Sequence, residues 1–269
     1  MLALRPDPEA LRELALEVAE RAAERLRAGA CTESARLLRG ETIGADLESE
    51  RVIVEALRSS GLSFRVVSEE SGVIGAGDYT FVVDPLDGSV NYEHCIPWSS
   101  VSVAVAPPGS SRLSDVVAGA VVPVFGGRPL SFARGSGCYE GDSRAPAPPV
   151  SLPKVLFVYV ESPGDVGPIA SLMESVRGLK VRSLGSAALE ISYAGLGRAY
   201  AFVDLRAKLR NVDVAAAVGL ARECGAAVVD RGGAPVDGPV DRVAVVGDVI
   251  VTARERLGDL MRGLGLART

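Results

Sequence analysis

Carboxylates that follow two strand-like runs constrain this sequence more than any other feature. The run 64–68 is rich in β-branched residues and is followed directly by Glu69 and Glu70. A second such run, 79–84, continues into the acidic turn 84–88, which reads Asp-Pro-Leu-Asp-Gly. Short β-branched runs that end at turn residues are typical of strands. Because carboxylates are seldom buried without a partner, we expect the fold to gather these groups at the end of a sheet and to neutralise them there.

The composition allows a large core around such a sheet. Of the 269 residues, 48% are hydrophobic, which suffices for one large domain or two smaller ones. No apolar stretch reaches the length of about 18 residues that spans a bilayer, and no secretory leader pattern is present. The net charge is −5 and no basic tract is interleaved with aromatic residues. We therefore expect a cytoplasmic protein that binds a small molecule, with neither nucleic acid nor a membrane as partner.

The cysteines predict little covalent cross-linking. They are spread along the chain as Cys31, Cys95, Cys138 and Cys224, and none belongs to a C-x-x-C pair that binds zinc or exchanges disulfides. In a chain of this length a disulfide framework is improbable, and a reducing cytoplasm is the expected compartment. A thermophilic source is the exception in which some of these cysteines would pair.

Periodicity predicts two helices before the strands. Asp7 and Pro8 are typical of a helix start, and apolar residues then recur at spacings of three and four up to Leu26. The period is lost over 33–44, where glycines favour a loop, and it returns over 47–60. Two further strands, paired antiparallel across a Pro-Pro-Gly turn, are predicted at 101–106 and 116–124.

A proline-rich segment divides the chain. Residues 144–153 hold four prolines in ten positions, so this stretch is extended and poor in backbone donors. We place a domain boundary near Val150, which gives an α+β half at 1–150 and a second half at 151–269. Beyond the boundary, strand-like runs alternate with helical segments, as is typical of a layered α/β unit. The strands are predicted at 155–159, 181–184, 199–204, 226–230 and 243–246, and the helices at 168–176, 187–194 and 212–224.

Several acidic residues predict a site for divalent cations. Those that adjoin apolar sequence are Asp46, Glu69, Glu70, Asp84, Asp87 and Asp213. If the fold brings them together, their charges repel and their pKa values rise unless cations lie between them. Oxygen-only ligands favour Mg²⁺ or Mn²⁺ over zinc, and two such ions can clamp the attacking and leaving oxygens of a phosphoryl transfer.

The residues after the acidic turn predict a phosphate site. Gly88 and Ser89 are expected to open a short helix, where backbone N–H groups favour an anion. Taken alone, the Glu69-Glu70 pair is better explained as a solvated strand end. The full run 84–89 favours a site over a plain turn, although Asp-Pro and Asp-Gly are common turn dipeptides.

Three motifs resemble one known family. They are Val-Ser-Glu-Glu-Ser at 67–71, Val-Val-Asp-Pro-Leu-Asp-Gly-Ser-Val-Asn-Tyr at 82–92 and Asn-Val-Asp-Val-Ala-Ala at 211–216. In order and spacing they are similar to the signatures of the inositol monophosphatase superfamily of lithium-sensitive phosphatases. The residues around Asp213 are most similar to archaeal-type members that act on both inositol 1-phosphate and fructose 1,6-bisphosphate. The resemblance implies an α+β fold, a layered αβαβα sandwich of two interlocked halves, in a homodimer.

The resemblance also implies roles for the acidic residues. A first Mg²⁺ would be bound by Glu69, Asp84 and the Leu86 carbonyl, and a second by Asp84, Asp87 and Asp213. Asp46 and Ser89 would orient or deprotonate the attacking water, and Asp46 with Glu69 would hold a weaker third ion. Gly88 and Ser89 would bind the phosphate. Mn²⁺ is expected to substitute for Mg²⁺, with two to three ions in each active site.

The second half is expected to determine substrate specificity. By resemblance, Ser186 opens a helix whose start meets the sugar or inositol ring, although a simple helix cap explains the same residue. An arginine fork would suit a second phosphate, as in fructose bisphosphate. The candidates are Arg182, Arg206, Lys208 and Arg210, with Tyr159 as a weaker one. Each of the four cations is also explained as an ordinary surface charge.

The expected activity is metal-dependent hydrolysis of a phosphate monoester, either inositol 1-phosphate or fructose 1,6-bisphosphate. Serine catalysis lacks support, because no G-x-S-x-G motif occurs and the only histidine, His94, is expected to pack or to hydrogen bond. Two alternatives stay open. One is a 3′(2′),5′-bisphosphate nucleotidase, and the other is a catalytically silent relative that binds a phosphorylated ligand or regulates a partner. The complete carboxylate set argues against the silent relative.

Overall fold

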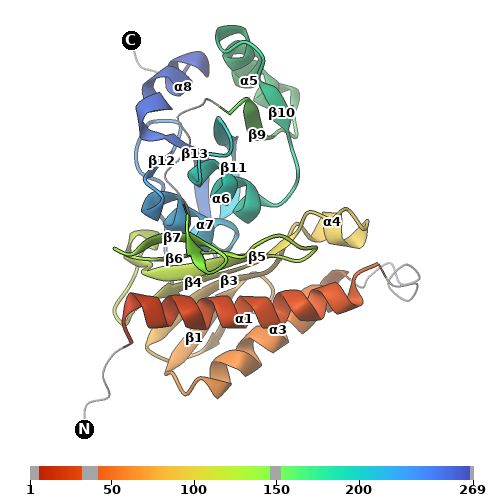
Figure 1. The fold of residues 1–269 in the computed structure, drawn as a ribbon, viewed down its shortest axis with the longest axis vertical. Coiled ribbons are helices and arrows are strands. Elements are labelled where there is room, and N and C mark those ends of the chain that lie inside the picture. Colours follow the sequence, from red (N-terminus) through yellow and green to blue (C-terminus); the bar gives the residue numbers. More distant parts are fainter. Residues whose placement is uncertain (1–5, 32–41, 146–152, 267–269) are drawn as a thin grey trace.

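The computed structural model describes residues 6–31, 42–145 and 153–266, and its elements stack in five layers (Figure 1). Helices α1 and α3 cover the outer face of an eight-stranded sheet, and α6 and α7 separate this sheet from a second, five-stranded one. Helices α5 and α8 cover the far face of the second sheet. This order confirms the predicted αβαβα sandwich. The helices are α1 (Pro8–Gly29), α3 (Thr42–Ser59), α4 (Ser89–Glu93), α5 (Pro163–Ser175), α6 (Ala187–Gly195), α7 (Asn211–Glu223) and α8 (Leu257–Gly263).

The first sheet brings two acidic motifs to the same end. Its order is β2-β1-β3-β4-β5-β6-β7-β8. Its strands are β1 (Phe64–Ser68), β2 (Gly72–Gly75), β3 (Tyr79–Asp87), β4 (Ser100–Ala106), β5 (Ala118–Pro123), β6 (Leu130–Ala133), β7 (Gly137–Glu140) and β8 (Ser143–Arg144). β1 runs parallel to β3 with Ser68 opposite Val83. Because the two strands run parallel in this register, Glu69, which follows Ser68, comes next to Asp84, which follows Val83 on β3.

The strand predictions for this sheet are confirmed in type and pairing. β1 occupies 64–68 as predicted, β3 begins at Tyr79 as predicted but extends to Asp87, and β4 pairs antiparallel with β5 as predicted. The link between β4 and β5 is longer than a Pro-Pro-Gly turn, because it contains the 3-10 helix η1 (Leu113–Asp115). The backbone N–H of Leu113 donates to Gly238 O at 2.8 Å, so this link is held by the second half of the chain. A contact of that kind has no local signal in the sequence.

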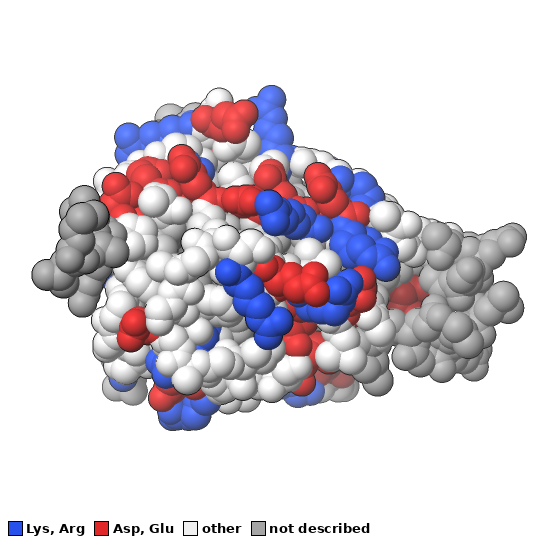
Figure 2. All heavy atoms as spheres, turned by 90° about the horizontal axis from the view of Figure 1, so that it is seen from below, with Lys and Arg blue, Asp and Glu red and all other residues white. Residues whose placement is uncertain are grey.

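The N-terminal helix begins as predicted. The Asp7 side chain accepts a hydrogen bond from the backbone N–H of Ala10 at 2.9 Å, and Pro8 occupies the first helical position. The buried side of α1 packs with α3 and the sheet, whereas an Arg25–Glu48 ion pair at 3.0 Å joins the two helices on the outside. Figure 2 views the molecule from this side and shows basic and acidic groups intermixed. No helix among the described residues is both long enough and apolar enough to cross a bilayer.

The second sheet has the order β10-β9-β11-β13-β12. Its strands are β9 (Val155–Tyr159), β10 (Lys180–Arg182), β11 (Ala201–Arg210), β12 (Ala226–Val229) and β13 (Val245–Ala253). The strand predicted at 243–246 is wrong in extent, because β13 begins at Val245 and continues to Ala253; its pairing with β11 stays in place across a register shift between the pairs Leu209–Gly247 and Asp204–Val249. The helix predicted at 168–176 begins earlier, at Pro163, because Ser162 and Asp165 form a capping box.

The two halves share one core. The predicted boundary near Val150 lies outside the described residues, and the division at 150 stays a prediction. One buried cluster nevertheless includes Phe132 of β6 and Phe202 of β11. A Cβ atom added to Gly219 of α7 would come within 2.2 Å of Phe132 Cζ, so this glycine lets the helix approach the ring. The helix that begins near Asp213 is therefore packed directly onto the first sheet.

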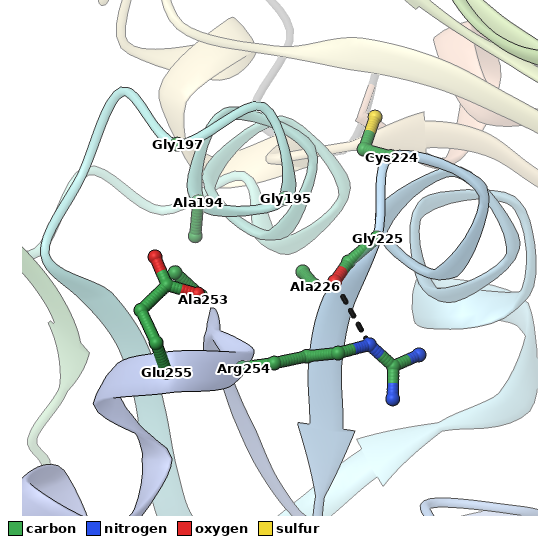
Figure 3. A pocket seen from close by; sticks show the side chains of 9 residues that line it. All are labelled: Ala194, Gly195, Gly197, Cys224, Gly225, Ala226, Ala253, Arg254 and Glu255. Carbon is green, nitrogen blue, oxygen red and sulfur yellow. Dashed lines mark hydrogen bonds between the residues drawn. The ribbon is translucent and has the colours of Figure 1, made fainter. Parts of the chain in front are cut away.

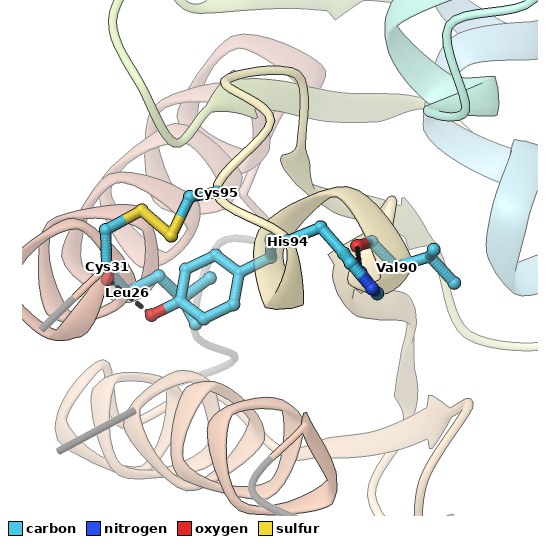
Figure 4. Close-up of a disulfide and its surroundings, with 6 residues drawn as sticks. Leu26, Cys31, Val90, His94 and Cys95 are labelled. Atoms are coloured by element: carbon cyan, nitrogen blue, oxygen red, sulfur yellow. Dashed lines mark hydrogen bonds between the residues drawn. A yellow bond between two sulfur atoms is a disulfide. The ribbon is translucent and has the colours of Figure 1, made fainter. Parts of the chain in front are cut away.

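Two disulfides contradict the expectation that the cysteines remain unpaired. Cys31 pairs with Cys95, and Cys138 pairs with Cys224, with Cα separations of 5.6 Å and 5.4 Å. The first bridge joins Cys31, just after the end of α1, to Cys95, which follows α4 after the intervening His94 (Figure 4). The paired cysteines are 64 and 86 residues apart in the sequence, and only tertiary packing brings them together. No local pattern in the sequence could therefore indicate these pairs. Pairing in a chain of this length matches the thermophile exception.

Candidate active site

Three carboxylates converge where the two halves meet. Glu69 follows β1, Asp84 lies on the parallel strand β3, and Asp213 is the third residue of α7. One oxygen from each of these residues lies within 4.8 Å of the other two. The structure therefore brings together groups that are 144 positions apart in the sequence, and this cluster could hold a metal ion.

Burial disfavours the charged forms of Asp84 and Asp213. Asp84 is only 3% exposed, and burial, reinforced by the charges of Asp87 and Glu69, raises its pKa well above the usual range. Burial also raises the pKa of Asp213. The Asp84 Oδ1 atom accepts a hydrogen bond from the backbone N–H of Leu86 at 3.0 Å, which fixes the acidic turn. Buried, oxygen-only donors that repel one another fit a hard divalent cation.

Asp87 is held by the start of α6. Its Oδ2 atom accepts hydrogen bonds from the Ser186 hydroxyl, the Ser100 hydroxyl at 3.0 Å and the Ala188 N–H at 3.0 Å. Within the described part of the chain, its Oδ1 atom accepts only the Ala187 N–H, at 3.0 Å. A carboxylate oxygen has two lone pairs, so Oδ1 retains one for a further contact. Burial raises the pKa of Asp87, and the Ser186 hydrogen bond acts in the opposite direction.

These contacts bear on Ser186, for which the sequence predicts contact with substrate. Its side chain is fully buried and its hydroxyl donates to Asp87. Ser100, which sequence reasoning missed, lies 3.2 Å from the Ser186 hydroxyl and is equally buried. The geometry thus favours an action of Ser186 through Asp87 over direct contact with a ligand. Nothing in the local sequence distinguishes Ser100 from other strand serines.

Gly88 allows the two halves to approach at the predicted phosphate turn. It has φ of +85°, and a Cβ atom there would lie 2.9 Å from Gly185 O and 3.0 Å from Trp98 O. The turn leads into α4, which begins at the partly exposed Ser89. Asn91 Nδ2 donates to Leu184 O at 2.6 Å, which fastens α4 to the loop before α6. The position after the acidic turn therefore requires glycine.

Asp46 lies close enough to Glu70 and Glu69 to be affected by their charges. It belongs to α3, is 8% exposed, and its Oδ1 atom is buried without a hydrogen-bond partner among the described residues. Burial, followed by the charges of Glu70 and Glu69, raises its pKa to about 7. Glu70 itself faces Glu69 and Glu50, and burial raises its pKa. An unpartnered buried carboxylate oxygen needs a water, an ion or a ligand as partner.

Arg210 lies inside the acidic cluster rather than at a separate phosphate site. Its guanidinium donates to Glu69 and, at 3.2 Å, to Asp213 Oδ1. Its backbone N–H donates to Asp213 Oδ2 at 2.8 Å as part of the cap of α7. The Arg-x-x-Asp spacing is the local signal that would have indicated this capping contact. The contact with Glu69, 141 residues away, has no such signal.

The other predicted substrate residues form one group and one outlier. Arg206 stacks over the Tyr159 ring at 4.5 Å and pairs with Asp204 at 2.7 Å, so its charge is already engaged. Arg206 and Lys208 both contact Glu161. Arg182 stands apart on β10, where its exposed guanidinium donates to the carbonyl of Val181 at 2.8 Å. The structure thus brings Tyr159, Arg206 and Lys208 together but not Arg182.

Two further features complete the surroundings. Sequence reasoning missed Glu190, a fully buried residue of α6 whose Oε1 accepts the Leu184 N–H at 2.7 Å. Its place in an apolar helical run is the signal that could have indicated a buried acid. His94 contacts the Val90 carbonyl at 2.9 Å (Figure 4), which agrees with the expected hydrogen-bonding role.

A separate hollow lies away from these residues. It has a volume of about 210 Å³ and is formed where α6 and α7 end, close to β12 and η2 (Arg254–Arg256) (Figure 3). Arg254 Nε donates to the Gly225 carbonyl at 3.0 Å on one side of it. Its lining contains none of the residues predicted for the site, and it lies at the opposite ends of α6 and α7 from Ser186 and Asp213.

Comparison with known proteins agrees with the motifs. The inositol monophosphatase family matches residues 7–259. An inositol-1-monophosphatase of Aeropyrum pernix is 44% identical over 96% of this chain and 98% of its own length. A fructose-1,6-bisphosphatase/inositol-1-monophosphatase of Methanothermobacter thermautotrophicus is 34% identical over 72% of each chain. A solved Pyrococcus horikoshii protein, described as similar to inositol-1 monophosphatase, superposes with a TM-score of 0.76 at 27% identity, over 98% of this chain and all of its own. This chain belongs to the inositol monophosphatase family.

Proposed function

We propose that this protein hydrolyses phosphate monoesters with divalent metal ions as cofactors. The observation that carries the proposal is the convergence of Glu69, Asp84 and Asp213, whose oxygens lie within 4.8 Å of one another. Relatives across the family are named for activity on inositol 1-phosphate, on fructose 1,6-bisphosphate or on both. We propose the same two substrates for this chain.

The proposed cofactor is Mg²⁺, for which Mn²⁺ would substitute, with two to three ions in each site. Glu69, Asp84 and the Leu86 carbonyl would hold the first ion, and Asp84, Asp87 and Asp213 the second. Bound there, such ions make a water acidic enough to attack phosphorus and stabilise the charge of the leaving oxygen. The buried, mutually repelling carboxylates support this assignment, as does the free lone pair on Asp87 Oδ1.

Groups of the chain would position the reactants. Asp46 offers a buried carboxylate oxygen that no other described residue uses, so it would accept a hydrogen bond from the attacking water. Ser89 would hold the same water, and the tight turn at Gly88 and Ser89 would bind the phosphate. In this arrangement Glu69 serves both the metal and the water.

Specificity would come from the group around Tyr159. Arg206 and Lys208 are held by Glu161, so a second phosphate would have to replace this acidic partner. Arg182 would contribute only if a ligand extends to β10. Ser186 would not contact the substrate ring directly. Its hydroxyl donates to Asp87, and through Asp87 it would help to position the ring.

The experiment that tests this function is a substrate panel with and without Mg²⁺. Phosphate release would be measured from inositol 1-phosphate, fructose 1,6-bisphosphate and 3′-phosphoadenosine 5′-phosphate. Metal-dependent release from either of the first two is the expected result. Preference for the nucleotide would instead indicate a bisphosphate nucleotidase, and tight binding without any release would indicate a catalytically silent relative.

We also propose a cytoplasmic homodimer without a membrane or nucleic acid partner. The net charge of −5 disfavours nucleic acid as a partner, and the homodimer is what the family resemblance of the motifs implies. Sedimentation equilibrium would test the assembly, since a mass near 28 kDa rather than twice that value would contradict the dimer.

A further inference from the structure

Arg210 places a positive charge where the proposed ions would bind. Its guanidinium donates to Glu69 and to Asp213, two of the three residues in the converging cluster. A divalent ion would need oxygens of the same two carboxylates. The guanidinium and the ion therefore compete for the same negative charge.

We propose that Arg210 is the counter-ion of the metal-free site, and that a divalent ion displaces its guanidinium from Glu69 and Asp213. This inference rests on the proposed metal site. Without a cation, Glu69, Asp84 and Asp213 would repel one another at this separation. Arg210 offsets part of that repulsion and keeps the carboxylates assembled before the metal arrives.

The backbone of Arg210 can stay in place while its side chain leaves. The backbone N–H caps α7 by donating to Asp213 Oδ2 at 2.8 Å, and this contact does not involve the guanidinium. The Arg210 side chain is 35% exposed, against 13% for that of Asp213, so the guanidinium lies on the solvent side of the pair. Ion pairs at such exposure are weak, whereas several carboxylates bind one divalent ion strongly.

Neighbouring cations on the same strand do not share this position. Arg206 pairs with Asp204 and Glu161, and among the residues that the structure describes Lys208 pairs with Glu161 alone. Lys208 is therefore a matched control: it carries the same charge, lies two residues from Arg210 and contacts a different acid. A general effect of lost positive charge would appear at both positions, whereas competition with the metal would appear at Arg210 only.

An alternative role for Arg210 predicts the opposite change in affinity for the metal ion. If the guanidinium stayed on Glu69 and Asp213 in the metal-loaded protein, it would orient these ligands and support metal binding. Its removal would then weaken the binding of the ion. A counter-ion that is displaced must instead hinder binding, so its removal must tighten it.

The test compares Arg210→Gln, Arg210→Lys and Lys208→Gln with the unsubstituted protein. Titration calorimetry would measure Mn²⁺ binding to metal-free protein, and thermal unfolding would be followed in EDTA and in saturating Mn²⁺. For Arg210→Gln we expect about fivefold tighter Mn²⁺ binding and a lower Tm in EDTA. In saturating Mn²⁺ its Tm should match that of the unsubstituted protein. Arg210→Lys should fall in between, and Lys208→Gln should bind Mn²⁺ as the unsubstituted protein does.

Equal or weaker Mn²⁺ binding by Arg210→Gln would overturn the inference, and so would a Tm deficit of the same size in EDTA and in Mn²⁺. Tighter binding by Lys208→Gln to the same degree would also overturn it, because the effect would then be general. If the unsubstituted protein binds Mn²⁺ and releases phosphate while Arg210→Gln binds no tighter, only the role of Arg210 fails. If the unsubstituted protein binds no Mn²⁺, the proposed metal site fails and this inference fails with it.

Discussion

Removal of either disulfide should lower the stability of this protein by a calculable amount. The bridges close loops of 64 and 86 residues in the unfolded chain. Loop-closure entropy predicts that such bridges stabilise the folded protein by about 4.3 and about 4.6 kcal/mol at 25 °C. The two loops, 31–95 and 138–224, do not overlap, so each constrains a separate stretch of the unfolded chain. The two contributions should therefore add to about 9 kcal/mol.

This energy converts into a melting shift. An entropy of unfolding of about 2.1 cal/mol/K per residue gives about 0.56 kcal/mol/K for 269 residues. Loss of one bridge should then lower the Tm by about 8 °C, and loss of both by about 16 °C. The nearly equal shifts are characteristic of the entropic mechanism, because loop length enters only through its logarithm.

Differential scanning calorimetry on three variants would check these values. One variant carries Cys31→Ala and Cys95→Ala, the second carries Cys138→Ala and Cys224→Ala, and the third carries all four changes. Free thiols counted by mass spectrometry before each scan would verify that the remaining bridge is closed. Shifts below about 2 °C, or a fourfold variant no less stable than either pair, would refute the loop-entropy reasoning.

The remaining predictions concern the site and its supports. Asp84→Asn should lower kcat about a hundredfold or more and weaken Mn²⁺ binding, because both proposed ions use this carboxylate; a variant that keeps most of its turnover in the substrate panel would contradict the assignment. Ser186→Ala should weaken Mn²⁺ binding about tenfold in calorimetry because Asp87 loses a buried donor, whereas a changed KM with unchanged metal affinity would instead favour direct contact with substrate. Burial raises the pKa of Glu190 to about 8, so the neutral acid stabilises the folded protein at low pH and this stability is lost as the pH rises from about 4.5 to about 8. In Glu190→Gln, the decrease in the free energy of unfolding across this pH range, measured by urea unfolding, should be smaller by at least about 1 kcal/mol. An unchanged dependence of this free energy on pH would show that Glu190 does not cause the decrease.

Local signals predicted the elements that position the site. The cap at Asp7 begins α1, and the β-branched run 64–68 forms β1 with the same bounds. The motif at 84–89 places Asp84 on a strand and Ser89 at the start of a helix. Each of these signals acts over one to four residues, through a cap, a period or a fixed turn. That is why the sequence alone was sufficient to find them.

The prediction also succeeded in choosing the acids that converge. Glu69, Asp84 and Asp213 were selected because each adjoins apolar sequence, and the structure places their oxygens within 4.8 Å. Local sequence did not reveal which groups surround them. Asp87 takes its donors from Ser100 and from a helix start 99 positions away, and these contacts give Ser186 a role the motif did not suggest.

By itself the sequence determined which segments are strands and helices, which acids are buried at their ends, and which family the chain resembles. Tertiary structure alone decided that the cysteines pair, that Asp87 is held by α6, and that the Arg210 guanidinium contacts Glu69. The physical reason is distance along the chain. Backbone propensity and capping depend on adjacent residues, whereas these contacts join residues 64 to 141 positions apart and form only when the tertiary structure brings their elements together.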